Sequence, residues 1–199
     1  MRAIGLTWGD PYSVKTYSGV PYHLFEELRQ RDVLRERLDA KQQRPADLLR
    51  GAIDVRRSVR SRRPVRRAIW RYLPENIESL TGRVRERQSR LAPHDVALQF
   101  GVAGLPAGPL VAHVEIPLEL VFELPVFAAS YGFADVDERT ARRAIDGERD
   151  FLSACDVVWT NSSWTAAALG QQGLDEARIR VCPPACGVDD PGPVDRDWS

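Results

Sequence analysis

Residues 137–169 read DERTARRAIDGERDFLSACDVVWTNSSWTAAAL, and this stretch decides the predicted fold. Apolar residues recur at helical spacing over 137–154, which predicts an amphipathic helix. The run over 155–160 is short, apolar and rich in valine, which predicts a buried strand. Three polar residues then precede a second helix over 164–169. A strand between two helices is typical of an α/β protein with a parallel sheet. The core face of the first helix is expected to use Ala141, Ala144, Ile145, Phe151 and Leu152.

The rest of the chain repeats this alternation of strands and helices. Residues 2–8 predict a strand, and a loop then leads to a helix that starts near Val20, with Ser18 as its N-cap and Pro21 in its first turn. The pattern predicts a doubly wound, mostly parallel sheet with flanking helices, which binds ligands at the carboxyl ends of its strands. Further strands are expected over 33–38, 94–100, 110–114 and 178–182, two or three helices over 44–91, and a short element of either type over 125–129.

Composition and charge narrow the class of protein. The chain has 199 residues, of which 43% are apolar, and 28 basic residues balance 28 acidic ones. This composition excludes a disordered chain and allows a single core. The balance does not hold locally, however, because residues 41–90 carry 15 basic and 5 acidic residues, whereas residues 91–199 carry 7 basic and 17 acidic ones. Such asymmetry predicts an anionic partner or an internal acidic neighbour for the basic stretch.

The cysteines and the apolar runs exclude several other classes. Cys155, Cys182 and Cys186 cannot form a disulfide framework, and their spacing is a poor zinc signature, so we predict no metal. We expect them to be small buried side chains in a reducing compartment. The uncharged run over 96–114 is broken by glycine and proline and indicates strand, loop and strand. With no signal peptide at the N-terminus, the sequence predicts a cytoplasmic protein.

Three segments resemble glycosyltransferases of the GT-B fold. Ser18-Gly19-Val20 and the following YHLFEEL helix resemble their first loop and helix. Residues 148–165, ERDFLSACDVVWTNSSWT, are similar to a helix, strand and capped helix of the family-four retaining enzymes. Residues 178–189, RIRVCPPACGVD, resemble the segment that ends their N-terminal domain, with Ala185-Cys186 inserted here. The resemblance covers residues 2–31 and about 92–190.

The resemblance implies that residues 1–190 form one Rossmann-like N-terminal domain, the acceptor-side half of a GT-B enzyme. A basic helical segment over 41–91 is then an insertion, and 191–199 is a linker or a cut end. The partners implied are a nucleotide-diphosphate sugar as donor, an acceptor of unknown nature and a C-terminal donor-binding domain that follows this chain. No cofactor or metal is implied.

The resemblance also places candidate site residues. Ser18 and Gly19 lie at a helix start, where N–H groups favour phosphate, and in the family this loop faces the donor's diphosphate. His113 and Glu115 end a predicted strand and would share one face of it. Family enzymes place a histidine just before an acid here, close to the transferred sugar, whereas Val114 separates the two in this chain. Each of these residues also has a purely structural interpretation, as a turn glycine or a strand-end histidine.

Asn161, Ser162 and Ser163 are the remaining binding candidates. They follow a predicted strand, where ligands bind, but helix capping alone would also explain them. The basic stretch over 55–71 offers a separate surface, because eight arginines and no acid precede an aromatic cluster. An anionic membrane surface at the inner face of the membrane, an internal acidic neighbour and, less favoured, nucleic acid are its alternative partners. The residues proposed for this surface are Arg62, Arg63, Arg66, Arg67 and Trp70.

The resemblance implies transfer of a sugar from a nucleotide-diphosphate sugar to an acceptor, with the isolated chain close to inactive. Two other functions stay open. One is a non-catalytic phosphate- or nucleotide-binding domain of the same fold. The other is an arginine-driven membrane or nucleic-acid adaptor, in which Gly19 plays no part.

Overall fold

A computed structural model describes residues 1–41 and 67–183, and the predictions for residues 42–66 and 184–199 lie outside it. The described residues hold one six-stranded sheet in the order β2-β1-β3-β4-β5-β6, and every neighbouring pair is parallel. The predicted doubly wound α/β class is therefore confirmed. The strands are β1 (Ala3–Thr7), β2 (Leu34–Asp39), β3 (Val96–Phe100), β4 (Leu110–Val114), β5 (Val157–Thr160) and β6 (Ile179–Val181).

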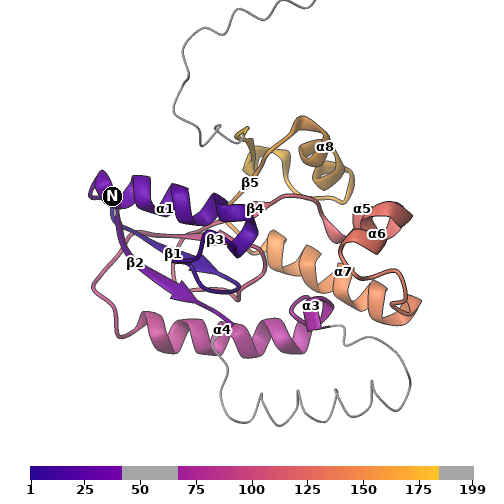
Figure 1. The fold of residues 1–199 in the computed structure, drawn as a ribbon, viewed down its shortest axis with the longest axis horizontal. Helices are drawn as coiled ribbons and strands as arrows, with labels where there is room; N and C mark the ends of the chain where they lie inside the picture. The colour runs from indigo at the N-terminus through magenta and orange to yellow at the C-terminus, as the bar shows by residue number, and fades with distance from the viewer. Residues whose placement is uncertain (42–66, 184–199) are drawn as a thin grey trace, which may run out of the picture.

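Helices cover both faces of the sheet. Figure 1 shows α1 on one side, with α4 and α7 on the other. The sheet strands carry little charge on their buried positions because both faces are covered in this way. The helices are α1 (Val20–Gln30), α3 (Arg67–Trp70), α4 (Pro74–Gln88), α5 (Leu118–Glu123), α6 (Pro125–Ser130), α7 (Glu138–Ser153) and α8 (Ser163–Gln171), with 3-10 turns η1 (Thr16–Gly19) and η2 (Glu176–Arg178).

Local sequence explains where the helices begin. The Asp137 carboxylate accepts from the Thr140 N–H at 2.9 Å and caps α7. Gly19 caps α1 with a left-handed φ of 83°, and Pro21 lies in the first turn as predicted. The prediction of Ser18 as the N-cap is wrong, because Ser18 itself has φ 55° and belongs to the 3-10 turn before the helix. The ambiguous segment over 125–129 is helical, as α6.

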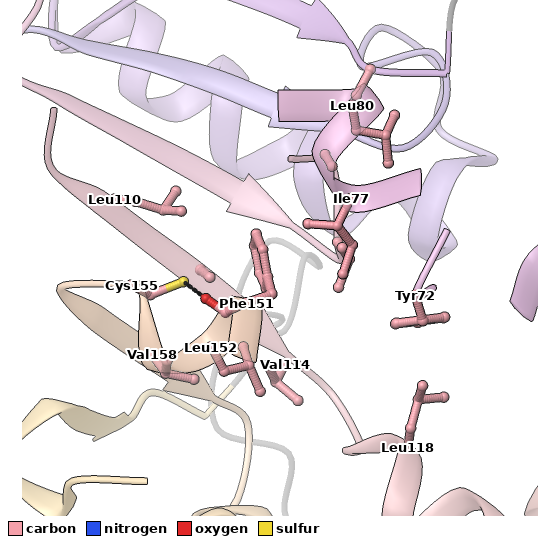
Figure 2. Packing of buried hydrophobic residues seen from close by; sticks show 14 of the residues in the cluster. Tyr72, Ile77, Leu80, Leu110, Val114, Leu118, Phe151, Leu152, Cys155 and Val158 are labelled. Atoms are coloured by element: carbon pink, nitrogen blue, oxygen red, sulfur yellow. Dashed lines mark hydrogen bonds between the residues drawn. The ribbon is translucent and has the colours of Figure 1, made fainter. Parts of the chain in front are cut away.

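The larger core lies between the sheet and helices α4 and α7. Figure 2 shows Phe151 and Leu152 of α7 close to Val114 of β4. Cys155 is buried in the same cluster, where its thiol donates to the Phe151 carbonyl at 3.3 Å. The expectation of buried cysteines holds for Cys155 but is wrong for Cys182, which is exposed just beyond the edge strand β6. Within the described ranges, no helix has the length and apolar character needed to cross a membrane.

The strand order places a switch point at β1. The chain passes from β1 to β2 on one side and then returns to β3 on the other, so the connections leave in opposite directions. Thr7 at the end of β1 is paired with Phe100 at the end of β3. The loops after these two strands therefore diverge from neighbouring positions, and in open α/β sheets this divergence is where ligands bind.

Candidate functional site

A cleft opens at the carboxyl edge of the sheet, beside this switch point. Its lining residues include members of four segments, which are the turn before α1, the end of β4, helix α7 and the connection between α3 and α4. The cleft therefore joins parts of the chain that are more than 100 residues apart. Its titratable side chains are Tyr17, Arg71, Tyr72, His113, Glu115, Tyr131 and Glu148.

His113 lies one residue before the end of β4 and is buried, with only 8% of its surface exposed. Its Nε2 shares a hydrogen bond of 3.0 Å with Asn161 Oδ1, and the rings of Phe100 and Trp159 pack at 5.0 and 4.9 Å. Because the amide oxygen can only accept, Nε2 carries the proton and a neutral imidazole keeps its lone pair on Nδ1. Burial lowers the pKa of His113, against the opposing effects of Asn161 and Glu115. The imidazole is therefore suited to act as a neutral hydrogen-bond acceptor or base.

Glu115 follows β4 and exposes its carboxylate in the cleft. Burial has the largest effect on the pKa values of His113, Tyr17 and Tyr131. The negative charge of Glu115 has a smaller effect, which raises the pKa of all three. The Glu115 backbone carbonyl accepts from Thr165 Oγ1 at 2.9 Å, which ties the end of β4 to the first turn of α8. The structure thus brings His113 and Glu115 to one cleft, and a ligand or catalytic role for either stays a prediction.

Asn161, Ser162 and Ser163 lie at the carboxyl end of β5, but they do not line this cleft. Ser162 is the N-cap of α8, and its Oγ accepts from the Thr165 N–H at 3.1 Å. Asn161 holds the His113 ring, as described above. Ser162 is therefore explained by capping, and Asn161 positions another residue. Direct ligand contact by any of the three stays a prediction.

The loop with Ser18 and Gly19 lies beside the cleft without lining it. Gly19 is buried, and a side chain there would meet the Val14 carbonyl oxygen at 3.1 Å in addition to the strain of its positive φ. The Val20 N–H already bonds to the Tyr17 carbonyl, and Pro21 has no N–H. The first two residues of α1 therefore offer no free N–H group to a phosphate in this conformation. The residue of this loop that does enter the cleft is Tyr17.

Arg71 is the cation of the cleft. It follows α3, where its Nη1 donates to the Tyr17 hydroxyl at 2.9 Å and its Nη2 donates to the Tyr72 hydroxyl at 2.5 Å. The guanidinium carbon lies 4.7 Å from the centre of the Tyr72 ring and 5.9 Å from that of Tyr17. Burial raises the pKa of both phenols, with Arg71 acting against it, so the two tyrosines are neutral partners.

Glu148 brings a buried carboxyl group to the cleft from α7. Its Oε2 accepts from the Leu118 N–H, at the first residue of α5, at 2.6 Å. Burial raises the pKa of Glu148 to about 7, although the Leu118 hydrogen bond and the charge of Arg71 act in the opposite direction. A carboxyl group whose pKa is raised in this way is suited to act as an acid or a base near neutral pH.

The basic surface predicted for the middle of the chain is only partly visible. Arg62, Arg63 and Arg66 lie outside the described residues, and Arg67 begins α3. The Trp70 side chain is partly buried and packs against the larger core. That is not the exposed position a lipid-facing anchor requires.

Sequence reasoning missed five of the seven titratable side chains of the cleft. Glu148 left a signal, since it falls four residues after Ala144 and three before Phe151, on the apolar face of its helix. An acid on that face must be buried with a partner. The sequence gives no signal for Arg71, because it is one of eight arginines over 55–71 and nothing in the local sequence distinguishes it from the other seven.

Comparison with protein-family models finds no match for this sequence, and comparison with curated proteins finds none either.

Proposed function

We propose that this chain is the acceptor-side half of a glycosyltransferase. It would work with a donor-binding domain to move a sugar from a nucleotide-diphosphate sugar to an acceptor, with retention at the anomeric carbon. The observation that carries the proposal is the pairing of His113 and Glu115 in the cleft at the switch point. The resemblance of residues 148–165 and 178–189 to retaining enzymes supports it.

The geometry supports distinct roles for the two residues. The His113 lone pair on Nδ1 accepts a hydrogen bond from a hydroxyl and so orients the sugar or the acceptor. The Glu115 carboxylate places negative charge where the sugar ring becomes positive in the transition state. The acceptor oxygen bonds to the anomeric carbon as the bond to the diphosphate breaks. The proton of the acceptor hydroxyl leaves with the departing diphosphate.

Asn161 has a supporting role in this proposal. Its Oδ1 accepts from His113 Nε2 and thereby fixes the tautomer, in the way that a carboxylate fixes a catalytic histidine. The capped start of α8 keeps the chain around Asn161 in place, because Ser162 and Thr165 bond to each other and Thr165 Oγ1 donates to the Glu115 carbonyl just after β4. Residues of β4, β5 and α8 thus act together to hold one imidazole.

The experiment is a transfer assay with the donor-binding domain supplied in the same chain or separately. We expect labelled sugar to pass from one member of a panel of UDP-, GDP- and ADP-sugars only when both domains are present. His113→Ala and Glu115→Gln should each lower the rate 100-fold or more, while Glu123→Gln on the exposed face of α5 should leave it unchanged. No transfer from any donor, with both domains folded, would overturn the proposal and favour a binding domain without turnover.

A further inference from the structure

Arg71 makes no direct ion pair with a carboxylate among the described residues, although its charge acts on the buried Glu148 carboxyl group of the same cleft. Its hydrogen bonds go to the hydroxyls of Tyr17 and Tyr72, at 2.9 and 2.5 Å. Both partners are neutral phenols, since burial raises their pKa values. Neutral oxygens satisfy donors but do not offset the charge.

One nitrogen of Arg71, the buried Nε, makes no hydrogen bond at all in the part of the chain that the structure describes. A charged donor that is buried and unsatisfied carries the full penalty of lost hydration. Proteins keep such groups mainly at functional sites, where a ligand supplies the missing acceptor.

The two phenols add further donors. Each hydroxyl accepts from Arg71 and therefore keeps its own proton for another acceptor. Neither phenolic proton has an acceptor among residues 1–41 and 67–183. The cleft thus presents a guanidinium and two O–H groups with spare donors. Such a set matches an oxyanion, and arginine prefers planar or tetrahedral oxyanions for its two-pronged bonds.

The placement of this cluster relates it to the proposed reaction site. The Tyr17 hydroxyl lies directly over Gly101, at the end of β3, where even a Cβ would come within 2.2 Å of it. Glu115 is near enough to raise the pKa of Tyr17, behind the effect of burial. Arg71, Tyr17 and Glu115 therefore line one continuous cleft, and a single ligand can reach both its anionic and its reactive ends.

We propose that Arg71, Tyr17 and Tyr72 form a subsite for a phosphate group carried by the acceptor. Phosphate is favoured over carboxylate because three terminal oxygens match three donor groups, whereas a carboxylate offers two. The assignment to the acceptor rests on the proposed function. The phosphate site itself rests only on the contacts around Arg71.

The experiment measures binding to the chain by calorimetry, with no donor sugar present. The probes are glucose 6-phosphate, glycerol 3-phosphate, inorganic phosphate and, as the uncharged control, glucose. The variants are Arg71→Lys, which keeps the charge but loses the two-pronged donor, and Tyr17→Phe, which removes one oxygen and keeps the ring. Arg142→Gln is the matched control, because it removes an arginine from the exposed face of α7. Near-ultraviolet circular dichroism checks that each variant is folded.

We expect at least one organic phosphate to bind ten-fold or more tightly than glucose. Arg71→Lys and Tyr17→Phe should each weaken that binding ten-fold or more, and Arg142→Gln should not change it. Absence of phosphate binding by the unmodified chain, or equal binding by all variants, would overturn the subsite. Inorganic phosphate binding as tightly as both organic phosphates would overturn the assignment to an acceptor.

The two proposals fail separately in these experiments. Phosphate binding that depends on Arg71, without sugar transfer to any acceptor, would count against the glycosyltransferase alone. Sugar transfer without phosphate binding would count against the subsite alone.

Discussion

Gly147 of α7 lies directly against the backbone of Tyr72. A Cβ at Gly147 would stand 2.1 Å from the Tyr72 carbonyl oxygen, so α7 passes the α3–α4 connection at a distance that only glycine allows. The residues next to this contact are Glu148 on one side and Arg71 on the other, and both line the cleft. The close approach therefore sets the width of the cleft where its cation and its buried acid meet.

Replacement of Gly147 by alanine should destabilise the protein although alanine is the better helix former. The Cβ would force α7 away from Tyr72, and overpacking of this kind costs about 2 kcal/mol. Gly82→Ala in α4 is the matched control, because nothing lies within 4 Å of its Cβ position. That change should stabilise the protein by about 0.5–1 kcal/mol. Urea unfolding of both variants measures the two free energies.

Equal effects of the two alanines would show that α7 does not pack against Tyr72 as described. A loss at both positions would point to helix α4 being closely packed at Gly82 as well.

The stability of the protein should fall as the pH rises through the range where Glu148 ionises. Its pKa is raised by burial from 4.5 to about 7 in the folded protein, so folding favours the protonated acid. The stabilisation is fully present below pH 4.5 and is lost as the pH approaches 7, with a total of about 3 kcal/mol.

Glu148→Gln should remove this pH dependence, because the amide oxygen still accepts from the Leu118 N–H and carries no charge at any pH. Thermal unfolding between pH 4.5 and 7.5 gives the comparison. If the unmodified protein and the variant show the same slope, Glu148 does not titrate in this range.

Strands β1, β3, β4 and β5 were predictable from sequence because each is a short and mostly apolar run. Strand β2 lacks this pattern, since charged residues occupy four of its six positions. The helix over 137–154 was predictable from its spacing, and its capping aspartate follows the general rule. The cap of α1 was not, because Ser18 is a common cap residue and only the backbone shows that Gly19 takes the left-handed position. Sequence statistics do not reveal which of two adjacent cap formers the turn geometry selects.

The site was predictable only in part, and the reason is topological. His113 and Glu115 lie at a strand end, where one segment of sequence shows the pattern. Tyr17, Arg71 and Glu148 come from three distant segments, and only the strand order brings them together. Arg71 bonds to its neighbour Tyr72, but its other hydrogen bond joins it to Tyr17 in a distant segment, and no local pattern encodes that contact.

Ser162 and Ser163 should differ in their effect on stability. Ser162 caps α8 through its bond to the Thr165 N–H, whereas Ser163 is the first residue within the helix. Ser162→Ala should cost about 1 kcal/mol and Ser163→Ala clearly less. Denaturant titrations of the two variants provide the test, and a larger loss from Ser163→Ala would mean that the helix begins one residue later.

Gly101 should be required for the position of Tyr17. Gly101→Ala places a methyl group against the Tyr17 hydroxyl and strains a backbone with φ 68°. Gly173→Ala is the control, since its φ is 88° and its Cβ position is open, so it shares only the backbone strain. We expect both to lower stability by about 1 kcal/mol, and only Gly101→Ala to weaken binding of the organic phosphates. If calorimetry shows that the two variants bind the organic phosphates equally well, Tyr17 does not contribute to the phosphate site.

The central claim is that one cleft combines sugar transfer near His113 with recognition of a phosphate at Arg71. Its most direct test compares kcat/KM for two acceptors that differ only by a phosphate group, with the donor-binding domain present. The account predicts that the unmodified protein favours the phosphorylated acceptor ten-fold or more, and that Arg71→Lys loses this preference while it still transfers sugar to the neutral acceptor. No transfer to either acceptor, or the same preference in both proteins, would contradict it.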